Sequence, residues 1–410
     1  MALYYGLLGE RLGHSYSKLI HERMYGCEYR LIELQPEALE GFLHARDFAG
    51  LNVTIPFKQA VIPFCDRLTD EAARIGAVNT LFFDSDGALT GDNTDLYGMK
   101  KMLEGFDLRG KDALLLGATG GTGKTAACAL SDLGARVIPV SRRGAVNYEA
   151  VYGIRADFLI NTTPVGMHPA LLQCPVEPEK IQGLTGVADV IYNPARTRLL
   201  QRAQGAGLWT AGGLGMLVHQ AAGSARRFLG APVEPGRVAE TLGWLARQTR
   251  SIALVGMPGS GKSTVARLVA QKLGRPLFDL DQRIEERHGP IPEIFARWGE
   301  ARFRELEAEA LGEAALERAA VIATGGGAVL SADNRTLLRA NAFVVQLERP
   351  LGELATGGRP LSTGAAALEE MYRMRQPLYR AVRDAVVPLC PWPEETAAQV
   401  IQKFREEVRA

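Results

Sequence analysis

Two glycine-rich turns that lie far apart in the sequence constrain the fold of this chain most strongly. Each turn follows a short apolar run and precedes a helical pattern, over residues 113–130 and 251–270. A strand, a glycine-rich turn and a helix in this order form the phosphate-binding element of nucleotide domains. Two such elements therefore predict two nucleotide-binding domains in one chain.

The pattern of apolar residues predicts the architecture around these turns. Short apolar runs alternate with helical patterns along the chain, which is typical of parallel α/β folds. A breaker-rich turn at 231–236 and a helical pattern at 237–247 predict a domain boundary near 247–250, with a very short linker. The clearest expected strands are 3–8, 113–116, 136–140, 157–160, 251–255, 321–323 and 343–347.

Composition excludes several classes of function. The 410 residues suffice for about two or three compact units. Lysine and arginine (47) nearly balance aspartate and glutamate (46), which argues against a general nucleic-acid binder. The five cysteines form no CxxC pair, and no apolar run has the length of a leader or a membrane helix. We expect a soluble cytoplasmic protein with small-molecule partners, no nucleic acid and no membrane.

The second glycine turn is a complete P-loop. Residues 256–264 are GMPGSGKST, between an apolar strand and a helix. The glycines let backbone N–H groups surround a phosphate, Lys262 adds a positive charge near the outer phosphates, and Ser263 offers a hydroxyl to Mg²⁺. The motif predicts that the domain binds a nucleoside triphosphate, and it leaves the acceptor open.

Polar residues after the P-loop bear on the acceptor. The next expected strand ends in FDLD, where a period of two would place Asp279 and Asp281 on one face. Acidic groups there can hold Mg²⁺ or orient a hydroxyl. Each residue alone is also explained by a helix cap, an ion pair within one helix or a turn. The segments that follow are GEARFRELE with Arg302 and Arg304, TGGG with Gly325–Gly327, GGRPL with Arg359, and RMRQPLY with Arg375.

Together and in this order, these motifs resemble the shikimate kinase family over residues 250–410. The resemblance implies a P-loop fold of the nucleoside-monophosphate-kinase type that transfers a phosphoryl group from ATP to shikimate, with Mg²⁺. It also implies that Lys262 and Asp281 are catalytic and that the arginines hold the carboxylate of shikimate. The implied shikimate-binding residues are Asp281, Arg304, Gly326 and Arg375. The implied ATP-binding residues are Gly256, Gly259, Ser260, Gly261, Lys262, Ser263, Thr264 and Arg359, and the implied magnesium residues are Ser263 and Asp279. The segment LATGGRPLS is shorter than the usual lid of this family.

The first glycine turn, GATGGTGKT at 117–125, matches neither phosphate motif completely. Ala118 stands where a P-loop would begin, and Thr119 replaces the second glycine of G-x-G-x-x-G. The next expected strand ends in SRR without an acidic residue. An acidic residue there accepts from a ribose 2′-OH, whereas Arg142 suits a 2′-phosphate. These residues favour a dinucleotide over a triphosphate, and NADP over NAD.

Polar motifs before this turn carry groups for acid–base chemistry. GHSYS places Ser15 and Ser17 after the first expected strand, and NVTIPFK and GDNTD carry Lys58 and Asp95. A lysine and an aspartate that meet at a carbonyl can exchange the proton that accompanies hydride transfer, a contribution of roughly 10²–10⁴-fold in rate. The structural alternatives are a surface lysine and a simple turn.

In this order, H-S-x-S, N-V-T-x-P-x-K, G-A-V-N-T and G-D-N-T-D resemble the shikimate dehydrogenase family over residues 3–247. Further matches lie at 161–167, 189–200 and 212–222. The resemblance implies that Lys58 and Asp95 are the catalytic pair. The implied substrate residues are Ser15, Ser17, Thr54, Lys58, Asn79, Asp95, Tyr192 and Gln220. The implied NADP residues are Gly120, Gly121, Thr122, Ser141, Arg142, Val190 and Gly213.

The two resemblances predict three units and two activities. We expect an α/β substrate domain at 1–95 plus 215–247, a Rossmann-like NADP domain at 96–214, and a kinase domain at 250–410. The chain would reduce 3-dehydroshikimate with NADPH and phosphorylate the product with ATP, consecutive steps of aromatic amino-acid biosynthesis. The alternatives are a quinate/shikimate dehydrogenase with an inactive or regulatory kinase half, and a kinase for a different small polyol. No oligomeric state is predicted.

Overall fold

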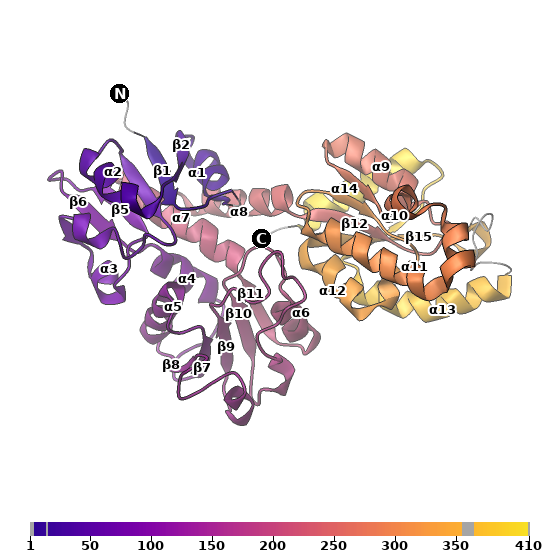
Figure 1. Ribbon diagram of the computed structural model, residues 1–410, viewed down its shortest axis with the longest axis horizontal. Coiled ribbons are helices and arrows are strands. Elements are labelled where there is room, and N and C mark those ends of the chain that lie inside the picture. The colour runs from indigo at the N-terminus through magenta and orange to yellow at the C-terminus, as the bar shows by residue number, and fades with distance from the viewer. Residues whose placement is uncertain (1–3, 14, 355–364, 409–410) are drawn as a thin grey trace.

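The computed structural model describes residues 4–13, 15–354 and 365–408. Three β-sheets follow one another along the chain, each with its own helices (Figure 1). All seven expected strands are present, with ends that differ from expectation by no more than two residues. Among the described residues, no helix is both long and apolar enough to cross a membrane. The predicted α/β architecture is therefore confirmed.

The first sheet has six strands in the order β2-β1-β3-β5-β6-β4. The chain-wide pattern predicted parallel sheets, but this sheet is mixed. β3 pairs with β5, and β5 with β6, in antiparallel fashion. The tight turn between β5 and β6 allows this pairing, since a short connection can join only antiparallel neighbours. The strands are β1 (Tyr5–Gly9), β2 (Tyr29–Glu33), β3 (Gly50–Val53), β4 (Arg67–Leu68), β5 (Thr80–Phe83) and β6 (Leu89–Asp92), and the helices among them are α1 (Ser17–Tyr25), α2 (Leu39–Ala45) and α3 (Asp70–Ile75).

The second sheet is parallel, in the order β11-β10-β9-β7-β8. Its strand β7 is apolar on both faces: Ala113 and Leu115 join one buried cluster, and Leu114 and Leu116 join another. This double burial is typical of parallel sheets covered by helices on both sides. The strands are β7 (Asp112–Leu116), β8 (Arg136–Val140), β9 (Phe158–Asn161), β10 (Gly186–Asp189) and β11 (Trp209–Gly212), and the helices are α4 (Asp95–Leu103), α5 (Gly121–Asp132), α6 (Arg198–Gly205), α7 (Gly213–Leu229) and α8 (Pro235–Thr249).

The third sheet is also parallel, in the order β13-β14-β12-β15-β16. Its central strand β12 alternates between two buried clusters, with Ala253 and Val255 in one and Ile252 and Leu254 in the other. The strands are β12 (Ser251–Val255), β13 (Leu277–Asp279), β14 (Val321–Ala323), β15 (Ala342–Glu348) and β16 (Ala385–Pro388). The helices are α9 (Lys262–Leu273), α10 (Leu280–His288), α11 (Ile291–Leu316), α12 (Ala332–Asn341), α13 (Ala365–Val382) and α14 (Pro393–Glu407).

A single residue, Arg250, separates α8 from β12. In Figure 1, α8 runs from the first sheet toward the third, and α6 lies beside α12. Arg196, before α6, forms an ion pair with Asp384 of the third unit at 2.6 Å. It also donates to the carbonyls of Arg339 and Ala342, at 2.7 Å each. The third unit is thus held to the second by partly buried polar contacts as well as by the chain itself.

Candidate active sites

A cavity of about 320 Å³ lies between the first sheet and α7. The strands β1 and β3 end here, and α4 begins here with Asp95, so the ends of several elements bring their polar side chains together. All eight residues that the sequence assigned to this substrate site line the cavity: Ser15, Ser17, Thr54, Lys58, Asn79, Asp95, Tyr192 and Gln220.

Lys58 and Asp95 form the central contact of this cavity. The Lys58 Nζ lies 2.6 Å from the Asp95 Oδ2, and Asn79 Nδ2 donates to the other oxygen, Oδ1, at 2.8 Å. Asp95 is buried, and Lys58 is largely so. Thr94 N–H donates to Asn79 Oδ1 at 2.7 Å, which fixes the amide that holds Asp95. The arrangement can hold a proton between two groups with little exposure to water.

Hydroxyl groups line the opposite side of this cavity. Ser15 and Ser17 lie 3.1 Å apart, oxygen to oxygen, at the start of α1. Tyr192 is largely buried, and burial raises the pKa of its hydroxyl, which therefore stays protonated and able to donate. Its ring packs 5.2 Å from that of Tyr16, which lies between the two serines.

Seven further residues line the cavity without having been assigned to it: Leu7, Arg11, Leu12, Gly13, Asn52, Val53 and Leu217. Asn52 belongs to the motif NVTIPFK, but the residues that it contacts were not predicted. Its Oδ1 accepts from Tyr29 at 2.8 Å, and its Nδ2 donates to Thr80 at 3.2 Å. The motif NVTIPFK carried the signal, because Asn52, in β3, and Thr54, directly after this strand, are two residues apart and so share one side of an extended chain.

The incomplete glycine turn follows β7 at the carboxyl edge of the second sheet. Gly117 has a φ of 79°, and Gly120 precedes the first residue of α5. A Cβ on Gly123 would overlap the Gly117 carbonyl, so only glycine permits this close approach of helix and turn. Gly123 was not among the expected residues. Its spacing within the glycine cluster was the available signal, since the third glycine of dinucleotide motifs serves helix packing.

The other expected cofactor residues follow neighbouring strands at the same edge. Ser141 and Arg142 follow β8, Val190 follows β10, and Gly213 follows β11. A Cβ on Gly213 would overlap the Val190 carbonyl. Because β7 lies between β8 and β9, the strand order reverses here, and such a reversal is where parallel sheets bind ligands. The residues directly after β8 include no carboxylate, which fits a 2′-phosphate better than a free 2′-OH.

A second cavity, of about 490 Å³, lies over the carboxyl edge of the third sheet. Most residues expected at the kinase site line it: Gly259, Gly261, Lys262, Ser263, Thr264, Asp281, Arg304, Gly326 and Arg375. Gly256 and Ser260 belong to the same loop without lining the cavity. Arg359 lies outside the described residues.

The P-loop has the conformation that its glycines predict. Gly259 and Gly261 have φ values of 83° and 77°, in the left-handed region, and α9 begins at Lys262. The Lys262 ammonium donates to the carbonyls of Gly256 and Met257 at 3.0 and 2.9 Å. A buried lysine at a helix N-terminus gives this end of the cavity a strong preference for anions.

Arg304 also lines this cavity. Gly299, with a φ of 78°, interrupts α11, so Arg304 lies on the second part of this helix. Arg304 pairs with Glu307 at 2.7 Å and with Glu300 at 3.0 Å. Burial alone would lower the pKa of Arg304, but the two carboxylates outweigh burial and raise it, so the guanidinium stays charged.

Two residues near Arg304 line the cavity as well. Arg375 is almost fully buried and lines the cavity from α13. The Glu307 side chain is fully buried at the wall, and burial raises the pKa of its carboxyl. Glu307 was considered only as an ion-pair partner, although its place in GEARFRELE, three residues after Arg304, puts it on the same helix face.

The sequence predicted that Asp279 and Asp281 lie on one face of a strand, and this prediction is wrong. β13 ends at Asp279, and the chain is helical from Leu280 onward. Asp279 is the N-cap of α10 and accepts from the Gln282 N–H at 3.4 Å, while Asp281 lies in the first helical turn. Asp281 still lines the cavity, and Asp279 does not. A carboxylate one residue before a helix serves as a cap, and this preference prevails over the continuation of the strand.

Family models match both parts of the chain. The shikimate dehydrogenase substrate-binding domain matches residues 7–81, and shikimate kinase matches residues 258–407. The shikimate dehydrogenase (NADP⁺) of Archaeoglobus fulgidus is 38% identical in an alignment of 247 positions that covers 54% of this chain and 90% of that protein.

Solved structures agree with these matches. A chorismate mutase/shikimate 5-dehydrogenase fusion protein from Clostridium acetobutylicum has a TM-score of 0.57 and 34% identity, covering 60% of this chain and 97% of that one. The shikimate 5-dehydrogenase of Thermus thermophilus in complex with NADP(H) and shikimate has a TM-score of 0.53 and 32% identity, covering 59% and 98%. This chain therefore belongs to the shikimate dehydrogenase family through its N-terminal part and carries a shikimate kinase domain in its C-terminal part.

Proposed function

We propose that this chain is a bifunctional enzyme that reduces 3-dehydroshikimate to shikimate with NADPH and then phosphorylates shikimate with ATP. One observation carries the proposal: a single chain holds both a Lys58–Asp95 ion pair in one cavity and a P-loop that shares a second cavity with Arg304 and Arg375. The matches to both families favour two activities over a dehydrogenase with an inactive kinase half.

In the dehydrogenase half, we assign proton transfer to Lys58 and Asp95. Bound NADPH supplies the hydride. Lys58 Nζ donates a proton to the oxygen that becomes the new hydroxyl, and Asp95 Oδ2, 2.6 Å away, stabilises the ammonium before transfer. Ser15 and Ser17 provide hydroxyl donors for the carboxylate of the substrate. The remaining proposed contacts with the substrate come from Thr54, Asn79, Tyr192 and Gln220.

The carboxyl edge of the second sheet suits NADP. The close approach at Gly123 brings the N-terminus of α5 to the turn where a pyrophosphate would lie. Arg142 offers a cation for a 2′-phosphate. The full set that we propose for NADP is Gly120, Gly121, Thr122, Ser141, Arg142, Val190 and Gly213.

In the kinase half, Arg304 and Arg375 are proposed to hold the carboxylate of shikimate, beside the Gly326 backbone. Asp281 orients the hydroxyl that accepts the phosphoryl group. Bound MgATP supplies that phosphoryl group. Lys262 can exchange the two loop carbonyls for phosphate oxygens. The proposed magnesium residues are Ser263, in the first turn of α9, and Asp279, at the end of β13.

The domain division expected from the sequence remains part of the proposal, as does a cytoplasmic location. α7 and α8 return to pack against α1, which supports a substrate domain of 1–95 plus 215–247. α8 ends directly before β12, which supports a kinase domain that begins at 250. The middle unit, 96–214, would be the NADP domain.

The test combines 3-dehydroshikimate, NADPH and MgATP with the purified chain and follows shikimate 3-phosphate by mass spectrometry. Lys58→Met should abolish NADPH oxidation and leave the phosphorylation of added shikimate intact, and Lys262→Met should do the reverse. Lys111→Met, a surface change, serves as the control. Absence of shikimate 3-phosphate with the unmodified chain would refute the proposal.

A further inference from the structure

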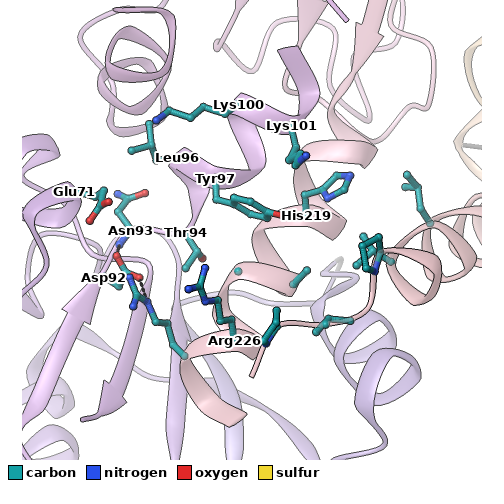
Figure 2. A pocket seen from close by; sticks show the side chains of 18 of the residues that line it. Glu71, Asp92, Asn93, Thr94, Leu96, Tyr97, Lys100, Lys101, His219 and Arg226 are labelled. Atoms are coloured by element: carbon teal, nitrogen blue, oxygen red, sulfur yellow. Dashed lines mark hydrogen bonds and ion pairs between the residues drawn. The ribbon is translucent and has the colours of Figure 1, made fainter. Parts of the chain in front are cut away.

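A third cavity, of about 450 Å³, lies among α4, α7 and the start of α8 (Figure 2). It uses a different face of α7 from the substrate cavity: His219, Ala222, Gly223 and Arg226 line the third cavity, whereas Leu217 and Gln220 line the substrate cavity. Its volume lies within the range of about 300–1,000 Å³ that is typical of small-molecule sites. Neither proposed reaction uses it.

The charges around this cavity favour an anion. Its lining has four cationic side chains, Lys100, Lys101, Arg226 and Arg227, against the carboxylates of Glu71 and Asp92. Three of these cations are already paired: Lys100 with Asp132, Lys101 with Glu104, and Arg227 with Asp92. Within the part of the chain that the structure describes, Arg226 forms no ion pair.

Arg226 is also well placed to meet a ligand. Figure 2 shows its side chain extending into the space below Tyr97 and near Thr94. An arginine that is not engaged by a protein carboxylate offers its planar donor fork to a ligand carboxylate. We therefore identify Arg226 as the group that would recognise the anion.

The remaining walls favour a ring. Tyr97 is 44% exposed, and its ring meets that of His219 edge-on, with centroids 6.3 Å apart. The apolar part of the lining comes from α8 and the turn before it: Pro232, Val233, Pro235, Val238, Ala239 and Leu242. An exposed aromatic side chain and an apolar surface in one cavity favour a flat, apolar ligand.

From these features we propose that this cavity binds a small aromatic carboxylate. Its carboxylate pairs with Arg226, and its ring lies between Tyr97 and the apolar residues of α8. The site adjoins the dehydrogenase centre, since Thr94 lines it and holds Asn79, the partner of Asp95. The proposal concerns binding alone and does not depend on either proposed activity.

The test uses 3-(4-hydroxyphenyl)propionate and its amide, which share ring and hydroxyl and differ in charge. Binding to the full chain is measured by calorimetry with saturating shikimate present, so that both proposed shikimate pockets are filled. Arg226→Met should weaken binding of the acid by about tenfold or more, because one charge-assisted contact is lost. The amide should bind to the unmodified chain as weakly as the acid binds to this variant.

Two further variants make the result decisive. Ala239→Trp should block binding by filling the cavity, and Arg155→Met, which removes an exposed arginine elsewhere, should leave the affinity unchanged. Equal melting temperatures show that each variant is folded. The proposal is overturned if the acid fails to bind at 10 mM, if shikimate displaces it, or if Arg226→Met binds it as well as the unmodified chain does.

Discussion

The guanidinium carbon of Arg318, from the kinase half, lies 5.3 Å from the centre of the Tyr16 ring in the dehydrogenase half. Tyr16 packs against Tyr192, which lines the substrate cavity. The residue after Arg318, Ala319, has a φ of 54°, an unusual conformation for alanine. Its N–H donates to the Thr249 carbonyl at the end of α8, at 3.3 Å. The kinase half therefore supports a wall of the dehydrogenase site.

The Arg318→Met variant should test this support. A cation–π contact is worth about 0.5–2 kcal/mol, so we expect KM for shikimate in the dehydrogenase reaction to rise by roughly threefold. The kcat of the dehydrogenase and both kinase constants should stay the same, and Arg318→Lys should restore part of the loss. Steady-state kinetics of the two reactions on one preparation measure this. Equal KM values for Arg318→Met and the unmodified chain would contradict the assignment.

Gly327→Ala should impair the kinase selectively. A Cβ on Gly327 would overlap the guanidinium of Arg304, whose flexible side chain would then have to move. If Arg304 holds the substrate carboxylate, KM for shikimate in the kinase reaction should rise by about tenfold or more, because a charge-assisted contact is lost. KM for ATP and the dehydrogenase constants should not change.

Gly312→Ala is the matched control for this prediction. Gly312 lies in α11, and nothing lies within 4 Å of a Cβ added there. Alanine at this position should leave both activities intact and stabilise the helix by roughly 0.5–1 kcal/mol. If the two glycine variants have the same kinase constants, Arg304 does not contact shikimate.

The ion pair between Arg196 and Asp384 should contribute to stability across the second and third units. Burial would raise the pKa of Asp384, but the hydrogen bond and charge of Arg196 outweigh burial and lower it. Arg196→Met leaves a buried carboxylate without its main partner, which costs about 3 kcal/mol. Urea unfolding should show the loss. Arg136→Met removes an exposed pair with Asp112 and should change the unfolding midpoint very little.

His21 should make the folded state sensitive to acid. Its ring stacks on Tyr29 with centroids 4.2 Å apart, and burial lowers its pKa to about 3. Below its ordinary value of about 6.5, the unfolded chain binds a proton that the native state does not bind. Stability that is present above pH 6.5 is therefore lost as the pH falls toward 3, by about 1.4 kcal/mol per pH unit.

His21→Phe keeps the ring and removes the titrating group. The difference in free energy of unfolding between this variant and the unmodified chain should grow steadily as the pH falls from 6.5. Urea unfolding at a series of pH values measures that difference. Parallel curves for the two proteins would show that His21 takes up its proton in the native state as readily as in the unfolded chain.

The elements that the sequence predicted well are those that local chemistry determines. The P-loop follows from glycines beside Lys262 and Ser263, and the central strands from uninterrupted apolar runs. The eight substrate-site residues were gathered from separate motifs by resemblance to a family, because no local rule brings Lys58 to Asp95. The antiparallel pairing of β5 and β6 was missed, since the chain-wide alternation of strands and helices concealed one short hairpin.

Contacts between the halves could not be predicted from the sequence. Arg318 lies in a motif-free segment and Arg196 within the matched segment 189–200, and nothing in the neighbours of either residue indicates a partner more than a hundred residues away. Asp281 was expected on a strand, although a carboxylate at Asp279 was also a helix-start signal. Long-range contacts determine where the two arginines bind, and a helix cap determines where Asp281 lies. The local periodicity of the sequence determines neither.

The junction at Arg250 limits how the two enzymes could be separated into two chains. Ala246, in the last turn of α8, belongs to the same buried cluster as Ile252 and Leu254 of the kinase sheet. The Arg247 carbonyl accepts from Arg275 at 2.6 Å, and the Arg250 carbonyl accepts from the same side chain at 2.9 Å. A gene split at this codon would give a kinase with a gap in its core and a dehydrogenase with an exposed apolar helix end. The end of α8 therefore belongs to the packing of both enzymes, and the boundary between them lies within a helix.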